Sequence, residues 1–230
     1  MRVVILAGGI GSRLRPYTLS LPKPLLPIGE RPILEIIVRQ LASHGFTDIT
    51  LAVNHQADLF RAFFGDGSKW GLNITYSLER EALGTMGPLR LIDDLPEHFL
   101  VMNGDVLTDL DYGAAFRAHL AGDRLFTIFA AARKQKIDFG VLHLDAASRL
   151  TGFEEKPELG YTVSMGIYAA SRRILERIPS GQPFGFDHLM LGFLASGDAV
   201  DVHQHHGYWL DIGRPDDYER ASEEWARHGT

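Results

Sequence analysis

The chain of 230 residues contains no cysteine. This absence excludes a disulfide framework, a thiolate nucleophile and a zinc–thiolate site, and it fits a cytoplasmic location. Long apolar runs are missing as well, since none approaches the roughly 18 residues of a membrane span. The short apolar run after Met1 stops at Gly8, too soon for a secretion signal. We therefore expect a soluble protein with no membrane partner.

Basic residues are fewer than acidic residues. The sequence has 23 Lys and Arg against 29 Asp and Glu, so its net charge is −6, which argues against a nucleic-acid partner. Hydrophobic residues make up 45% and charged residues 23%, ordinary values that exclude wholesale disorder. At about 150 residues per domain, the length allows one or two domains.

The hydrophobic pattern of the first half predicts strands that alternate with helices. Apolar residues at helical spacing predict helices at 33–41 and 59–64. Short continuous apolar runs predict buried strands at residues 3–7, 49–53, 74–78 and 99–102. This alternation predicts a doubly wound α/β fold with a mainly parallel, Rossmann-like sheet. Ligands bind such sheets beyond the carboxyl ends of the strands, where both Gly8-Gly9 and Gly104-Asp105 lie.

The second half has shorter strands joined by short turns. The pattern predicts strands at 126–131, 141–144, 150–153, 163–168 and 208–212, and helices at 172–178, 188–194 and after Pro215. Linkers, low-complexity tracts and internal repeats are all missing from the sequence. We therefore expect a single domain, 1–230, with a small inserted lobe, and no C-terminal repeat domain.

A glycine-rich loop with Gly8, Gly9 and Gly11 follows the first strand, where backbone N–H groups can approach a phosphate closely. The third glycine of a dinucleotide fingerprint and the Gly-Lys-Ser/Thr of a Walker A loop are both missing, so a tight structural turn is the alternative. Arg13 and Lys23 follow in a segment stiffened by prolines. Cations held in place in this way favour polyphosphate binding.

Seven motifs, in order, resemble those of sugar-1-phosphate nucleotidylyltransferases. They lie at residues 6–16, 22–27, 83–85, 103–105, 153–157, 166–168 and 209–213 and cover nearly the whole chain. The resemblance implies that an oxygen of a sugar-1-phosphate attacks the α-phosphorus of a nucleoside triphosphate (NTP) and releases pyrophosphate. It also implies a nucleotide-binding half at about 1–110 and a sugar-binding half at about 111–230. The partners would be an NTP and a sugar-1-phosphate, and a homo-oligomer stays open.

The same resemblance assigns residues to this reaction. Arg13 and Lys23 would contact the phosphates, and Lys156 would be the counter-ion of the sugar phosphate. Asp105 and Asp211 each follow a strand-like run, could meet at one sheet edge, and would hold Mg²⁺, which prefers oxygen ligands. The further residues implied for the nucleotide are Leu6, Gly8, Gly9, Gly11, Ser12, Gly84 and Thr85. Asn54 is expected on the base side, with a turn at the end of its strand as the alternative. Those implied for the sugar phosphate are Gly140, Glu155, Ser164 and Gly166 beside Lys156.

The choice of base and sugar rests on fewer residues. Residues 83–89, Leu-Gly-Thr-Met-Gly-Pro-Leu, resemble a segment of mannose-1-phosphate guanylyltransferases, and the short chain resembles heptose-1-phosphate guanylyltransferases. GTP is therefore the first choice, with UTP or CTP as the alternative. Ser164 stands where the family more often has asparagine, and this departure bears on the identity of the sugar.

Two alternatives belong to other classes of protein. A metal-dependent glycosyltransferase also uses an aspartate on an α/β sheet, but it does not need the loop from Arg13 to Lys23. A non-catalytic subunit that senses nucleotide sugars has no need of two metal ligands, whereas this chain keeps both Asp105 and Asp211.

Overall fold

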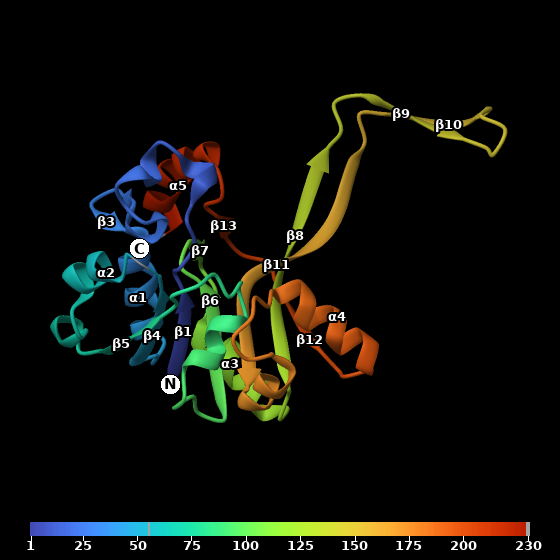
Figure 1. The fold of residues 1–230 in the computed structure, drawn as a ribbon. Helices are drawn as coiled ribbons and strands as arrows, with labels where there is room; N and C mark the ends of the chain where they lie inside the picture. Colours follow the sequence, from blue (N-terminus) through green and yellow to red (C-terminus); the bar gives the residue numbers. More distant parts are fainter. Residues whose placement is uncertain (55, 229–230) are drawn as a thin grey trace.

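The computed structural model describes residues 1–54 and 56–228, and a seven-stranded sheet forms its centre (Figure 1). The strand order is β12, β8, β11, β6, β1, β4, β5. The bounds are β1 Arg2–Leu6, β4 Asp48–Val53, β5 Asn73–Leu78, β6 His98–Asn103, β8 Phe126–Lys136, β11 Glu158–Ser171 and β12 Asp201–His205. The four strands predicted in the first half are thus confirmed to within one residue at each end.

The sheet is mainly parallel, as the sequence predicts. Strand β1 pairs in parallel with β4 and β6, β4 pairs in parallel with β5, and β12 pairs in parallel with β8. The exception is β11, which runs antiparallel to both β6 and β8. It does so because β8 and β11 are the two sides of one long ribbon whose ends are joined through a hairpin.

Both faces of this sheet are covered, which is what a doubly wound fold requires. Val3 and Ile5 of β1 belong to one hydrophobic cluster, and Val4 between them belongs to the other. The first cluster takes in α1 (Ile33–Ser43), α2 (Ala57–Phe64) and α3 (Tyr112–Ala121), together with Ala221 of α5 (Pro215–His228). The second takes in Leu189 and Phe193 of α4 (Phe186–Ser196). Successive side chains of one strand therefore pack into two hydrophobic cores, one on each face of the sheet.

Two helical segments differ from the prediction. The prediction from the sequence does not include helix α3. This helix has a weak apolar stripe and begins with Gly113 and Ala114 in its first turn, so its sequence shows little helical periodicity. Residues 172–178 form a 3₁₀ helix, Arg172–Arg177, in place of the predicted α-helix. Its last turn closes by a tighter bond, since the N–H of Ile178 donates to the carbonyl of Leu175 at 3.1 Å.

Shorter elements connect the main ones. Strand β7 (Val106–Thr108) pairs antiparallel with β13 (Trp209–Asp211), and β2 (Pro27–Ile28) pairs with β3 (Arg31–Pro32). The remaining 3₁₀ helices are Ser12–Leu14, Tyr17–Leu19, Lys23–Leu25, Ser68–Trp70 and Gly87–Leu91. Within residues 1–54 and 56–228, no helix has the length and apolar character needed to cross a membrane.

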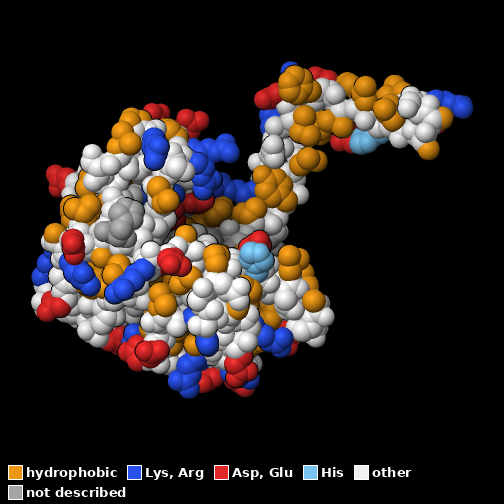
Figure 2. All heavy atoms as spheres, in the orientation of Figure 1, with side chains coloured by type: hydrophobic (Ala, Val, Ile, Leu, Met, Phe, Trp, Pro, Cys, Tyr) orange, Lys and Arg blue, Asp and Glu red, His pale blue; other side chains and the backbone are white. Residues whose placement is uncertain are grey.

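Strands β8 and β11 extend well beyond the sheet. Their ladder continues from Ala170 opposite Phe126 to Glu158 opposite Lys136, and a hairpin of β9 (Gly140–Leu144) and β10 (Leu150–Glu155) follows. We call residues 132–163 the arm. It projects from the body in Figure 1, and hydrophobic side chains are spread along its surface in Figure 2. The inserted lobe predicted for the second half is therefore a two-stranded arm.

Candidate functional site

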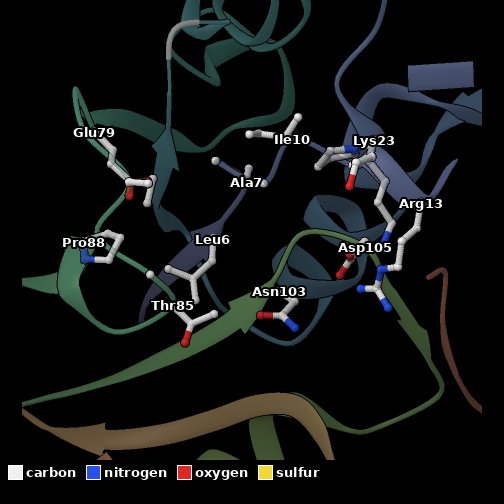
Figure 3. Close-up of a pocket in the computed structure, with 18 of the residues that line it drawn as sticks. Leu6, Ala7, Ile10, Arg13, Lys23, Glu79, Thr85, Pro88, Asn103 and Asp105 are labelled. Carbon is white, nitrogen blue, oxygen red and sulfur yellow. Dashed lines mark hydrogen bonds and ion pairs between the residues drawn. The ribbon is translucent and has the colours of Figure 1, made fainter. Parts of the chain in front are cut away.

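A cavity of about 490 Å³ lies beyond the carboxyl ends of β1 and β6, where a doubly wound sheet binds its ligands (Figure 3). Its size is within the usual range for small-molecule sites. Every residue predicted for the nucleotide lines it except Asn54, that is, Leu6, Gly8, Gly9, Gly11, Ser12, Arg13, Lys23, Gly84, Thr85 and Asp105. Sequence reasoning missed several further lining residues, among them Glu79, Pro88, Asn103 and Gly213.

The glycine-rich loop is tightly built against its neighbours. Gly11 has a φ of +64°, and a Cβ there would lie 3.0 Å from Cγ2 of Thr18. A Cβ on Gly8 would lie 2.8 Å from Oε2 of Glu79. Thr18 also donates from its hydroxyl to the carbonyl of Gly11 at 2.8 Å. The positive φ and the close contact with Thr18 favour glycine at position 11.

Asn54 supports this loop from outside the cavity. Its Nδ2 donates to the carbonyl of Gly8 at 2.6 Å, and its Oδ1 accepts from the N–H of Gln56 at 3.1 Å. Both ends of the side-chain amide are therefore engaged by the backbone. In this placement Asn54 positions the carbonyl of Gly8, and its role on the base side stays a prediction.

One end of the cavity is charged. Lys23 begins a 3₁₀ helix and is only 8% exposed, and its Nζ forms an ion pair with Oδ2 of Asp105. Asp105 stands in the turn between β6 and β7. Its other oxygen, Oδ1, is buried and has no hydrogen-bond partner. Arg13 lies beside this pair in Figure 3.

Asp211 does not line the cavity, but the pairing of β13 with β7 brings it close to Asp105. This pairing sets Asp211 opposite Val106, and the N–H of Ile212 donates to the carbonyl of Asp105 at 3.1 Å. Burial raises the pKa of Asp211, and the negative charge of Asp105 raises it further, whereas Lys23 and Arg13 act in the opposite direction. The two aspartates are thus close enough to interact, as their predicted positions at one sheet edge require.

This pair has the chemistry of a small cation site. An unpartnered, buried carboxylate oxygen beside a second carboxylate is a donor set that a hard divalent cation satisfies. Among the described residues, no group of three or more His, Asp or Glu forms a fuller ligand cluster. Two protein oxygens leave the other coordination positions to phosphate oxygens and water, the usual arrangement for Mg²⁺.

The opposite end of the cavity holds Glu79, at the carboxyl end of β5. Its Oε1 accepts a hydrogen bond from the N–H of Leu83, which fixes the carboxylate at the cavity wall. Gly84 follows with a φ of +76°, and a Cβ there would lie 2.8 Å from the carbonyl oxygen of Phe184. The position of Glu79 directly after a predicted strand is the signal that could have identified it, since the same rule identified Gly8 and Asp105.

The residues predicted for the sugar phosphate fall into two groups. Gly140, Glu155 and Lys156 lie on the arm, are exposed, and do not line the cavity. Gly140 and Glu155 face each other as a register pair of β9 and β10. Gly140, Glu155 and the adjacent Lys156 therefore form one cluster on the arm, at the point where the hairpin of β9 and β10 begins.

Ser164 and Gly166 lie instead at a bulge in β11, where the arm meets the sheet. Ser164 accepts from the N–H of Gly166 at 3.2 Å and donates to the hydroxyl of Tyr168 at 3.1 Å. Gly166 has a φ of +71°, and a Cβ there would lie 2.6 Å from Nδ2 of Asn103, which lines the cavity. The hydroxyl of Ser164 thus holds the bulge together beside the cavity wall.

Comparison with known proteins gives consistent matches. The family model described as nucleotidyl transferase matches residues 2–228. A mannose-1-phosphate guanyltransferase of Yarrowia lipolytica is 35% identical over 95% of this chain, and a UTP–glucose-1-phosphate uridylyltransferase of Synechocystis is 33% identical over 96%. The chain spans 62% of the length of each of these two relatives. The crystal structure of HddC from Yersinia pseudotuberculosis, complexed with GMP-PN, aligns with a TM-score of 0.74 and 28% identity, covering 97% of this chain and 99% of that one.

Proposed function

Because the chain belongs to the nucleotidyl transferase family, we propose that it transfers a nucleotidyl group from an NTP, preferably GTP, to a sugar-1-phosphate. The products are a nucleoside diphosphate sugar and pyrophosphate. The observation that carries this proposal is the charged end of the cavity, where Lys23, Asp105 and Asp211 meet next to the glycine-rich loop.

The reaction joins two anions, so its barrier lies largely in repulsion and misalignment. A phosphate oxygen of the sugar-1-phosphate forms a bond to the α-phosphorus, and the bond from that phosphorus to the bridging oxygen of pyrophosphate breaks. The backbone of Gly8 to Gly11 cradles the triphosphate, while Arg13 and Lys23 neutralise its oxygens. Lys23 is held in place by its ion pair with Asp105, and a charge fixed in advance stabilises a transition state.

Asp105 and Asp211 would hold Mg²⁺ at this end of the cavity. When bound, the ion neutralises phosphate charge and aligns the α-phosphorus for attack. Lys23 contributes a second positive charge and keeps Oδ2 of Asp105 in place through their ion pair. The unpartnered Oδ1 of the same aspartate is left to face the cation.

Preference for GTP is supported by Glu79. Guanine presents N–H donors on its Watson–Crick edge, including an amino group at N2, and an ionised carboxylate only accepts hydrogen bonds. With Oε1 held by Leu83, the Oε2 of Glu79 remains at the cavity wall as an acceptor. The similarity to a guanyltransferase points the same way, whereas the uridylyltransferase relative keeps UTP as the alternative.

The sugar-1-phosphate would bind between the cavity and the junction where the hairpin of β9 and β10 follows β8 and β11. Lys156 supplies the positive charge for its phosphate, and the carboxylate of Glu155 accepts hydrogen bonds from sugar hydroxyls. Gly140, opposite Glu155, keeps this position free of a side chain, since a Cβ there would lie 2.6 Å from the ring of Phe153.

The experiment is a matrix of GTP, UTP and CTP against mannose-, glucose- and heptose-1-phosphate, read by pyrophosphate release. We expect release only when Mg²⁺, the NTP and the sugar-1-phosphate are all present, and the highest kcat/KM with GTP. Removal of the metal by EDTA should abolish the signal, and added Mg²⁺ should restore it. Full-rate release from an NTP alone would indicate a hydrolase, and no release from any pair would favour a sensing subunit.

A further inference from the structure

The chain has three asparagines, and they differ in how their side-chain amides are used. The amide of Asn54 is engaged at both ends, and Nδ2 of Asn73 donates to Oδ1 of Asp48 at 3.1 Å. Asn103 is half-buried in the wall of the cavity, and within residues 1–54 and 56–228 its amide forms no hydrogen bond. An acceptor oxygen and a donor nitrogen are thus left for a ligand of the cavity.

The surroundings of Asn103 restrict the directions in which its amide can point. Asn103 ends β6, where it pairs in register with Leu6 of β1, and the N–H of Gly104 donates to the carbonyl of Leu6 at 3.0 Å. The bulge of β11 lies against the amide, since a Cβ on Gly166 would lie 2.6 Å from Nδ2 of Asn103. Glycine at position 166 therefore leaves the space that the amide occupies.

Asn103 lies between the two ends of the cavity. Asp105, two residues further along the chain, pairs with Lys23 at the charged end, and Glu79 lies at the opposite end. Figure 3 shows the amide of Asn103 between Thr85 and Asp105, with its oxygen on the side of Thr85. In a nucleoside triphosphate, the ribose is the part that joins the base to the α-phosphate. With the base at Glu79 and the phosphates at Lys23, the ribose therefore passes Asn103.

The chemistry of this amide matches that of a diol. The 2′- and 3′-hydroxyls of ribose are neighbours, and each of them can donate and accept hydrogen bonds. A carboxamide carries its acceptor and its donor side by side, so Oδ1 of Asn103 can accept from one hydroxyl while Nδ2 donates to the other. Thr85, on the same stretch of wall, already accepts with its Oγ1 from the N–H of Phe186 at 2.8 Å. Asn103 therefore has more hydrogen-bonding atoms free for a diol than Thr85 has.

We infer that Asn103 binds the 2′,3′-diol of the NTP and selects ribonucleotides over deoxyribonucleotides. Only the direction of the nucleotide in the cavity rests on the proposed function. A polar group that pairs with a substrate hydroxyl discriminates against an analogue without that hydroxyl, because the polar group then loses its partner. Neighbouring hydroxyls of the acceptor sugar offer the same chemistry from the side of Gly166, and the test separates these two sources.

The test is calorimetric titration of the full chain and of Asn103→Ala with GTP, 2′-deoxy-GTP and 3′-deoxy-GTP. Mg²⁺ is present and sugar-1-phosphate is left out, so binding is measured without turnover. We expect the wild-type protein to bind GTP about 10-fold or more tightly than either analogue, and Asn103→Ala to bind all three within about 3-fold. The matched control is Asn73→Ala, an exposed asparagine at the end of β5 opposite to Glu79, which should keep the wild-type preference.

Three results would overturn the inference. Equal affinity of the wild-type protein for GTP and both analogues would do so and leave the proposed function intact, whereas binding of no nucleotide would contradict both. The third result comes from initial rates with glucose-1-phosphate and 2-deoxyglucose-1-phosphate. If Asn103→Ala keeps the preference for GTP but changes the ratio between these sugars, the amide binds the acceptor sugar instead.

Circular dichroism checks that Asn103→Ala folds. If it does not, Asn103→Leu takes its place, because leucine has a similar size without the polar atoms, and it should show the same loss of preference. The comparison of GTP with its analogues on the wild-type protein needs no variant.

Discussion

Residues around the cavity are held by several elements at once, whereas the arm is a ribbon of two paired strands that contacts the body through Arg133, stacked on Trp209 at its base. Gly8 is fixed by Asn54 and packs beside Glu79, and Asp105 is paired with Lys23. On the arm, Glu155 and Lys156 are exposed, Glu155 is placed by its pairing with Gly140, and Lys156 follows directly after the strand. The cavity is thus fixed by contacts from several elements, whereas the exposed residues of the arm depend on strand pairing.

This difference suggests a division of labour. A preorganised region suits the phosphate chemistry, because fixed charges stabilise a transition state without reorganisation. An exposed region with fewer fixed contacts suits selection of the acceptor sugar. Changes at the cavity should therefore lower kcat, and changes on the arm should raise the KM for the sugar-1-phosphate.

The largest effect is expected from Asp105→Asn in the cavity. Loss of one charged metal ligand should lower kcat by about 100-fold or more, because the cation no longer balances the charge that develops on the phosphates. Steady-state pyrophosphate release at saturating Mg²⁺ measures this, with the exposed Asp58→Asn as control. Near-wild-type turnover would remove Asp105 from the metal site. Asp211→Asn should behave in the same way.

On the arm, Lys156→Met should act on binding. Loss of a charge-assisted hydrogen bond costs about 1.5–3 kcal/mol, which corresponds to a rise of roughly 10- to 150-fold in the KM for the sugar-1-phosphate. The kcat and the KM for the NTP should change little. Initial rates across both substrates separate these values, and Lys136→Met, also exposed on the arm, is the control. An equal rise in the KM for the sugar-1-phosphate and the KM for the NTP would contradict a separate sugar-binding role for the arm.

Glu79→Gln tests the base end of the cavity. Replacing a carboxylate by an amide adds a donor that faces the N–H groups of guanine, so the ratio of kcat/KM for GTP over UTP should fall about 10-fold. The neighbouring Glu81→Gln, exposed in the same loop, should leave the ratio unchanged. A GTP/UTP ratio unaltered by Glu79→Gln would mean that this carboxylate does not read the base.

The same contrast explains what the sequence could reveal. Buried parallel strands are continuous apolar runs, so the strands and the residues just beyond them, including Gly8 and Asp105, were predictable. The alternation at 141–144 and 150–153 predicted strands, but it carries no information on what covers their apolar face. Asn54 was predicted on the base side, and its hydrogen bond to Gly8 could not be predicted because it depends on how the fold brings the two residues together.

The smallest effect concerns Ser164, at the point where the arm leaves the sheet. Its family resemblance suggested a sugar contact, but its hydroxyl already bonds to the N–H of Gly166 and to the hydroxyl of Tyr168. Tyr168 is only 5% exposed, so Ser164→Ala leaves a buried hydroxyl without this partner, at a cost of about 1–3 kcal/mol. Thermal unfolding should show a Tm lower by roughly 2–10 °C.

Sugar preference distinguishes this positioning role from direct recognition. If Ser164 only holds the bulge, Ser164→Ala and Ser164→Asn should lower kcat/KM by the same factor for mannose-, glucose- and heptose-1-phosphate. A contact with one sugar hydroxyl would instead change the order of the three, because a site built around that hydroxyl penalises sugars that leave its polar groups unpaired. Competition assays with pairs of sugar-1-phosphates measure these ratios directly. A changed order of the three kcat/KM values in Ser164→Asn would mean that Ser164 contacts the sugar. Equal losses of kcat/KM for all three sugars would mean that Ser164 only stabilises the bulge between the cavity and the arm.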